Sequence, residues 1–185
     1  MKATSLLEDQ HRTVEALFEK LERGLGDPAA TVRTLAKHLL AHMAIEQDIF
    51  YPAIKDVDLE RVSENYEEHA LGEVALERLL ATDASDPVFK ARVVALKTLV
   101  EHHVMEEEEE LFPLVEESLS EDALIQLGKA LRVRFDALLE ADTSVAPKRG
   151  VAKTAADIAR KALTAKVPAR RSQKKDPKKD KTLFV

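Results

Sequence analysis

Two histidines, each followed four residues later by a glutamate, are the residues of this sequence best suited to chemistry. His42 precedes Glu46 in one half of the chain, and His103 precedes Glu107 in the other. Residues four apart on an α-helix share a face, so each pair points an imidazole nitrogen and a carboxylate oxygen the same way. Such a pair suits one metal ion, or two ions that share the carboxylate.

The segments that follow the two pairs also match. Phe50-Tyr51-Pro52 closes the first copy and Leu111-Phe112-Pro113 closes the second. In both copies the histidine lies ten residues before the proline and the glutamate lies six residues before it. This register selects His103 over its neighbour His102. It also selects one glutamate from the run at 106–110, whose other members we interpret as a solvated helix face that adds negative potential.

The elements that must position these pairs are expected to be five helices. A capping box, Ser5-Leu-Leu-Glu8, predicts the first start, and Asp-Pro pairs at 27–28 and 86–87 predict two more. Apolar residues at helical spacing predict the others. The expected ranges are 5 to about 23, 28 to near Pro52, 59–80, 87 to about 118, and 120 to about 141.

The first four helices resemble a duplicated helical hairpin, because each half has one histidine on its first helix and a His-x-x-x-Glu pair on its second. His11 and His42 are 31 residues apart, and His69 and His103 are 34 apart. Similar lengths and short loops predict an all-α fold, an antiparallel up-down-up-down four-helix bundle with an additional C-terminal helix. Bundles of this kind hold metal sites between facing helices.

Four helices would thus each deliver one histidine to a common level, and two of them would add an acid. This donor set suits iron or manganese, with zinc as a further possibility. Each residue alone is more often a surface or packing residue, and it is their shared register that favours a metal site. His38, one turn before His42, is expected either to hydrogen-bond a metal ligand from outside the site or to be a partly exposed side chain. The candidate ligands are His11, His42, Glu46, His69, His103 and Glu107.

Together, these motifs resemble the hemerythrin-like family, also called HHE cation-binding domains, over residues 4 to 118. The resemblance implies a non-haem di-iron centre with Glu46 and Glu107 as bridges and the four histidines as terminal ligands. Two glutamate charges cannot neutralise two such cations, so a hydroxo or oxo bridge, or nearby acids, would supply the remainder. An open position on the iron would suit a small ligand such as O2, peroxide or NO. The oxygen-carrying members have a second histidine on the third helix, where this chain has Glu73, and His-x-x-x-x-Asp on the fourth. These departures argue against simple oxygen carriage.

Two further residues follow from that comparison. Glu73 is either an additional, seventh ligand or a surface acid. Tyr66, one turn before His69, either hydrogen-bonds a bound peroxide or packs against its neighbours.

The charge of the chain divides it into two parts. From Lys148 onward there are 13 Lys and Arg against 3 Asp and Glu, whereas residues 1–147 have a balance of −16 and contain every histidine. We therefore expect a domain at 1–145 and a largely disordered basic tail at 146–185, with a short amphipathic helix over 151–166. The tail could contact nucleic acid or another anionic partner through 148–181, or fold back on the acidic bundle.

Composition excludes several other classes of protein. The absence of cysteine rules out disulfides, iron–sulfur clusters and thiolate zinc sites. No apolar run reaches the length of a transmembrane helix, and the first residues lack the core of a secretory signal, which predicts a cytoplasmic location. The sequence leaves the oligomeric state open. Two functions remain: a di-iron protein that binds or reacts with O2, peroxide or NO, with catalase-like activity as one form, or a non-enzymatic iron sensor or store.

Overall fold

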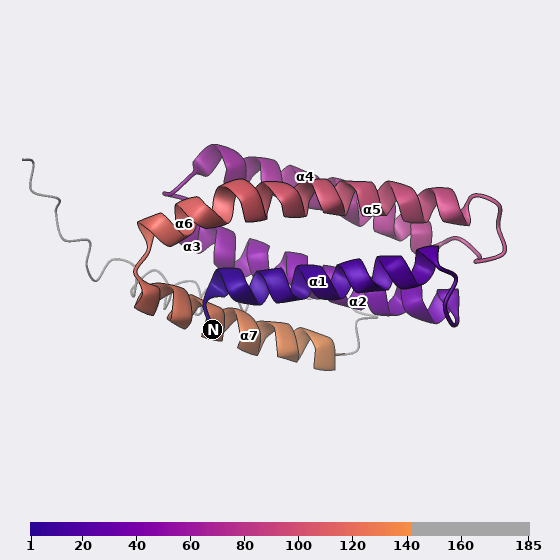
Figure 1. The fold of residues 1–185 in the computed structure, drawn as a ribbon, viewed down its shortest axis with the longest axis horizontal. Coiled ribbons are helices and arrows are strands. Elements are labelled where there is room, and N and C mark those ends of the chain that lie inside the picture. The colour runs from indigo at the N-terminus through magenta and orange to yellow at the C-terminus, as the bar shows by residue number, and fades with distance from the viewer. Residues whose placement is uncertain (142–185) are drawn as a thin grey trace, which may run out of the picture.

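The computed structural model describes residues 1–141, and all the elements in that range are helices. Figure 1 shows four long helices running alternately in opposite directions, as the duplicated hairpin predicts. The predicted domain boundary at 145, the helix over 151–166 and the tail lie outside the described residues. The four long helices are α1 (Ala3–Glu22), α2 (Pro28–Ile45), α4 (Leu59–Leu80) and α5 (Phe89–Glu106).

Two of the helices continue through a π-helical turn, which the sequence did not reveal. α2 passes into η1 (Glu46–Phe50) and then α3 (Tyr51–Ile54), and α5 passes into η2 (Glu107–Leu111) and then α6 (Phe112–Ser118). In both turns a backbone N–H reaches the carbonyl five residues back, that of Glu46 or Glu107. A proline follows each turn. Because proline has no N–H and its ring clashes with the carbonyl four residues earlier, an uninterrupted α-helix would be strained there.

Two predicted helix starts were wrong. α1 begins at Ala3, so Ser5 lies inside the helix, and Lys2 at the N-cap makes no side-chain capping bond. The first turn is held by tertiary contacts instead: Thr4 Oγ1 donates to Glu116 at 2.5 Å. α5 begins at Phe89, because Asp86 closes a turn by accepting from the Val88 N–H at 2.9 Å.

The apolar core is divided into two clusters with a polar layer between them. One cluster, which includes Leu6, Phe50 and Leu131, lies at the end of the bundle that contains α3 and α6. The other, which includes Phe18 and Leu76, lies toward the opposite end. The polar layer between the two clusters contains the candidate metal ligands.

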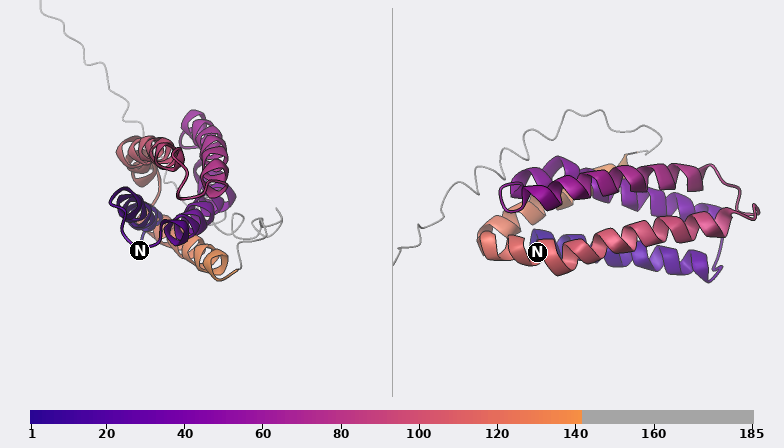
Figure 2. Two further views of the ribbon diagram at one scale, coloured as in Figure 1. Left: turned by 90° about the vertical axis from the view of Figure 1, so that its right-hand side faces the viewer. Right: turned by 90° about the horizontal axis from the view of Figure 1, so that it is seen from above.

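The fifth helix, α7 (Glu121–Glu140), covers only one side of the bundle. It packs against α1 and α2, and in the end-on view of Figure 2 it lies outside the ring of four helices. Gly128 permits this contact, because a Cβ there would approach the Met1 carbonyl oxygen to 2.6 Å. The α4–α5 side has no such cover among the described residues. Within this range no helix combines the length and the apolar character needed to cross a membrane.

Candidate metal centre

Four helices each contribute one histidine to the polar layer, and all four side chains are buried. His11 comes from α1, His42 from α2, His69 from α4 and His103 from α5. They form two pairs that meet through their Nε2 atoms. The Nε2–Nε2 distance is 3.2 Å between His11 and His42 and 3.0 Å between His69 and His103. The predicted register is therefore present in space as two adjacent imidazole pairs.

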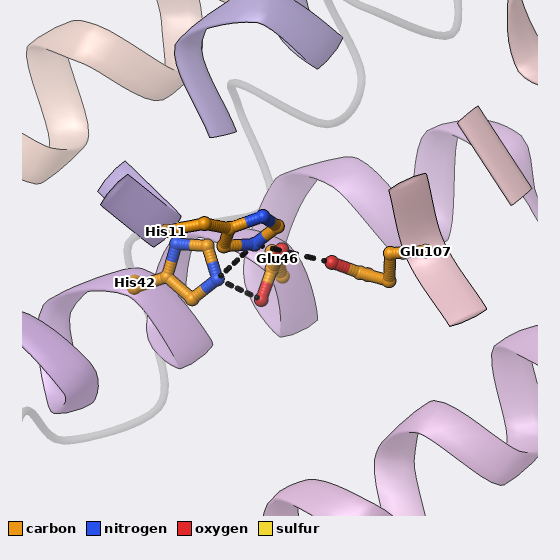
Figure 3. A group of neighbouring side chains, drawn as sticks. All are labelled: His11, His42, Glu46 and Glu107. Carbon is orange, nitrogen blue, oxygen red and sulfur yellow. Dashed lines mark hydrogen bonds and ion pairs between the residues drawn. The ribbon is translucent and has the colours of Figure 1, made fainter. Parts of the chain in front are cut away.

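The two glutamates lie between these pairs and are fully buried, each as the first residue of its π turn. Glu46 Oε2 lies 3.1 Å from the Nε2 of His42 and 3.3 Å from that of His69. Glu107 Oε2 lies 3.5 Å from the Nε2 of His11 and 3.7 Å from that of His103. Each carboxylate thus reaches one imidazole of each pair, which is the arrangement that bridging two cations requires. Figure 3 shows one half, in which His11 and His42 converge with both glutamates.

The outward ring nitrogens of the four histidines all have a polar partner. Such partners fix the ring orientation and the proton position of a metal-binding imidazole. With the Nδ1 proton directed toward an oxygen, the Nε2 atoms of His11, His42 and His103 present their lone pairs to the centre, whereas the Nδ1 atom of His69 accepts from the Gln47 amide. The Nδ1 contacts are 2.8 Å for His11 with Glu108 Oε1, 2.8 Å for His42 with Gln10 Oε1, 3.1 Å for His69 with Gln47 Nε2, and 2.8 Å for His103 with Glu68 Oε2.

The two glutamates have different surroundings although they occupy matching positions. Glu107 Oε1 accepts hydrogen bonds from the Tyr51 hydroxyl at 2.9 Å and from the Asn65 amide at 3.3 Å. Neither oxygen of Glu46 has a hydrogen-bond partner among the described residues. The position that matches Tyr51 in the second half is Phe112, which stacks on His11 and has no hydroxyl to donate. The duplicated centre is therefore chemically asymmetric.

The pKa values of the two carboxyl groups are shifted in opposite directions by burial and by neighbouring charges. Burial raises the pKa of Glu46 well above its usual range, and the charge of Glu107 raises it further. Burial opposes ionisation of Glu107 as well, but the imidazoles of His103 and His11 outweigh it and lower the pKa of that carboxyl. Burial also lowers the pKa of His42, and burial with the neighbouring His103 lowers the pKa of His69 to about 3.

The donor set fits metal ions. At neutral pH the low pKa values of His42 and His69 leave these imidazoles neutral, as metal ligation requires. The Nε2 atoms of both face Glu46, a buried acid that has no hydrogen-bond partner among the described residues, and this arrangement is costly unless a cation lies between them. Imidazole nitrogens combined with carboxylate oxygens are ligands for borderline cations such as iron, manganese and zinc.

Comparison with known proteins agrees with this geometry. The family model of the hemerythrin HHE cation-binding domain matches residues 2–115. The chain belongs to this family. A crystal structure of an HHE cation-binding domain-containing protein from Mycobacterium kansasii has the same fold, with a TM-score of 0.67 and 24% identity. The alignment covers 76% of this chain and 88% of that protein.

A DNA nickase from Nostoc sp. (strain PCC 7120) is 30% identical to this HHE protein over 126 residues. The aligned region is 66% of this chain but only 36% of the nickase. The chain thus spans about a third of the length of this relative.

Three residues considered from the sequence lie away from the centre of the HHE domain. Glu73 is on the exposed face of α4, which fits the surface-acid alternative, and the buried residue beside it is Gly72. Tyr66 is 37% exposed and donates to the Gln47 carbonyl at 3.0 Å, so it packs against η1 rather than facing the histidines. His38 is half-buried and its ring lies 6.1 Å from that of Phe135 on α7.

The polar residues that hold the ligands of the HHE domain were missed from the sequence. Gln10 and Glu68 each lie immediately before a candidate histidine, and Gln47 and Glu108 each lie immediately after a candidate glutamate. Each holds a histidine from another helix. Their regular position next to the candidate ligands was a usable signal, but polar residues are common on such helices. Tyr51 was interpreted only as part of the closing aromatic-proline segment.

A cavity of about 30 Å³ adjoins the four histidines. This volume is large enough to hold a water molecule or a small ligand. Its remaining walls are mainly apolar, from Val14, Leu39, Met43, Leu99 and Val100, and Gly72 forms one side. A Cβ placed at Gly72 would have no heavy atom within 4 Å, so the absence of a side chain there leaves open space beside the centre.

Proposed function

We propose that this HHE domain holds a non-haem di-iron centre in which the four histidines are terminal ligands and Glu46 and Glu107 are shared between the ions. One observation carries the proposal. Six buried donor groups converge, and three of their carboxylate oxygens, Glu46 Oε1 and Oε2 and Glu107 Oε2, have no hydrogen-bond partner among the described residues. Two imidazoles and two shared carboxylates per ion leave room for a further small ligand. Glu73 has no part in this proposal.

We infer that the ligand is small and uncharged, such as O2, hydrogen peroxide or NO. When bound, the iron pair would supply redox chemistry and exchangeable coordination positions for such a molecule. The cavity beside Gly72 supports this inference, because its volume suits two or three heavy atoms and its apolar walls disfavour a charged ligand. Catalase-like decomposition of peroxide is the form of this activity that we expect.

The residues of the chain would orient and protect the site. Tyr51 holds Glu107 in place and keeps its proton, because burial and the charge of Glu107 raise the pKa of its phenol well above the usual range. Gln10, Gln47, Glu68 and Glu108 fix the imidazole rings from outside. The two apolar clusters above and below the polar layer keep bulk water out.

Metal analysis of protein purified without added metal, followed by anaerobic reconstitution with ferrous iron, tests the proposal. We expect two irons per chain, an oxo-bridge absorption band after exposure to O2 or peroxide, and oxygen evolution from peroxide. His103→Ala should lose iron, and His38→Ala should retain it, because His38 lies outside the centre. Iron that binds the His103→Ala variant as tightly as the unmodified protein would contradict the proposed ligand set.

An iron sensor or store is the second candidate, and the unpartnered carboxylate of Glu46 favours it. A buried acid without a partner destabilises the metal-free bundle, so occupancy would be coupled to stability. Chelation should then lower the thermal midpoint, whether or not peroxide is consumed. A midpoint unchanged by chelation would exclude this function.

We also propose that the basic segment 148–181 contacts nucleic acid or another polyanion. The sequence supports this by its excess of basic residues, and a DNA nickase is among the relatives. A salt-dependent gel shift that compares the full chain with residues 1–147 is the test, because phosphate contacts weaken with salt. Equal affinity of the two proteins would contradict the proposal.

A further inference from the structure

The motif His-x-x-x-Glu occurs twice in overlapping form at the end of α5, where it passes into η2. His103 and Glu107 face the centre, and His102 and Glu106, one residue earlier, lie about 100° around the helix. His102 is 55% exposed, and its Nε2 lies 3.6 Å from Glu106 Oε1. The outer pair has the ligand types and spacing of the inner pair, but it faces solvent.

Glu68 on α4 connects the outer pair to the centre. Its Oε2 accepts a hydrogen bond from His103 Nδ1 at 2.8 Å, and its Oε1 lies 3.8 Å from His102 Nε2. One donor atom each from Glu68, His102 and Glu106 therefore falls within 4.8 Å of the others. We call these three residues the outer cluster.

The outer cluster has no counterpart in the first half of the duplicated bundle. The matching positions of His102 and Glu106 are Ala41 and Ile45, which are 2% and 0% exposed. These apolar residues belong to the core cluster to which α7 also contributes. The fifth helix covers the α1–α2 side, whereas the α4–α5 side is left open and carries a histidine and two acids instead.

The cavity beside the centre reaches the outer cluster. Glu68 is one of its lining residues, together with His69, His103 and Gly72. Gly72 follows Glu68 by four residues on the same face of α4, and both residues line this cavity. The carboxylate of Glu68 thus lies between the exposed His102 and the buried His103.

We propose that Glu68, His102 and Glu106 form a third cation site, which captures a divalent metal ion from solvent and passes it to the centre. The inference rests on the proposed di-iron centre as the destination. Two carboxylates neutralise a divalent charge, and one imidazole with two carboxylates suits ferrous iron, manganese or zinc, with water in the remaining positions. Turning of Glu68 carries the ion inward, and the departing ion leaves Glu68 free to hold His103 again.

The test compares His102→Ala and Glu106→Gln with a control, Glu117→Gln, which removes an exposed acid that makes no ion pair among the described residues. Glu68 itself is left unchanged because it holds His103. Equilibrium dialysis with Mn²⁺ and with Zn²⁺ measures the ions bound per chain. Stopped-flow mixing of metal-free protein with Zn²⁺ and a chromophoric chelator measures the rate of loading.

We expect the unmodified protein and the control to bind three equivalents of metal ion per chain, two tightly and the third more weakly. His102→Ala and Glu106→Gln should each weaken the third equivalent about tenfold or more, keep the two tight ones, and slow their loading several-fold at low metal concentration. Unchanged loading in both variants would overturn the inference, even if the third equivalent is lost. Absence of the two tight equivalents from the unmodified protein would instead refute the proposed centre.

Discussion

The two buried glutamates should respond to the same substitution with opposite changes in stability. In metal-free protein, burial and the charge of Glu107 raise the pKa of Glu46 and favour its protonated form, whereas the pKa of Glu107 is lowered and its carboxylate accepts two hydrogen bonds. Replacing either acid with glutamine keeps the shape and removes the titration. Glu46→Gln should therefore stabilise the metal-free bundle at neutral pH, and Glu107→Gln should destabilise it.

The magnitude for Glu46→Gln follows from proton linkage. Above the unfolded pKa of 4.5, the native state holds a proton that the unfolded chain releases, so wild-type stability falls as pH rises toward the raised folded pKa. The loss is at most about 1.4 kcal/mol for each pH unit between the unfolded pKa and the raised folded pKa. The glutamine amide does not titrate and can donate to the Nε2 atom of His42 at every pH, so the variant avoids this loss.

For Glu107→Gln the sign is reversed. Its folded pKa is lowered, so the ionised carboxylate stabilises the protein above pH 4.5, and this contribution disappears as pH falls through the folded pKa. Glutamine retains the contacts with Tyr51 and Asn65 but removes the charge that strengthens them, which costs about 1–2 kcal/mol at pH 7.

Urea unfolding of chelator-treated protein, followed by circular dichroism at pH 5 and pH 7, measures both effects. The free energy of unfolding of Glu46→Gln, relative to that of the wild type, should increase as pH rises. Glu107→Gln should be less stable than the wild type at pH 7. Both variants should lose metal. A Glu46→Gln variant that is equal to or less stable than the wild type at pH 7 would refute the conclusion that the buried, titrating acid at position 46 destabilises the metal-free protein.

Three other substitutions extend these arguments. Tyr51→Phe should destabilise the metal-free protein by about 1–2 kcal/mol in urea melts, because its hydroxyl donates to a buried carboxylate, and Tyr66→Phe, on an exposed tyrosine, should cost less. Gly72→Ala should stabilise by about 0.5–1 kcal/mol, because a Cβ meets open space in a helix interior. Gly128→Ala should destabilise by about 1–3 kcal/mol, because its Cβ would meet the backbone at residues 1–3. Thermal melting measures both glycine variants. A shift of the thermal midpoint in the same direction for both would contradict the packing argument.

Much of the fold was accessible from the sequence because its signals are local. The range of α4 was predicted as observed, and Asp27 caps α2 as expected, accepting from the Ala29 N–H at 3.0 Å. The start of α1 was not predictable in this way, since it depends on contacts with Glu116 and Gly128 far along the chain. The π turns could not be predicted either, because a proline indicates a break in a helix but not the hydrogen-bond pattern that accommodates it.

The candidate centre shows why the duplication was informative about some residues and not others. Comparing the two halves of a sequence emphasises what they share, so it selected His103 over His102 and Glu107 over its acidic neighbours. The same comparison passes over positions at which the halves differ. Tyr51 matches Phe112, and Glu68 matches Gln10, so neither stood out.

Those differing positions give the centre its asymmetry. The Tyr51 hydroxyl donates to Glu107, whereas Glu46 has no hydrogen-bond partner among the described residues. The histidine on α5 contacts the carboxylate of Glu68, whereas the matching histidine on α2 contacts the amide of Gln10. If the halves were identical, the two metal positions would be equivalent and neither side would be favoured for an incoming ion. The shared residues therefore account for metal binding itself, while the residues in which the halves differ determine which acid is strained and from which side an ion arrives.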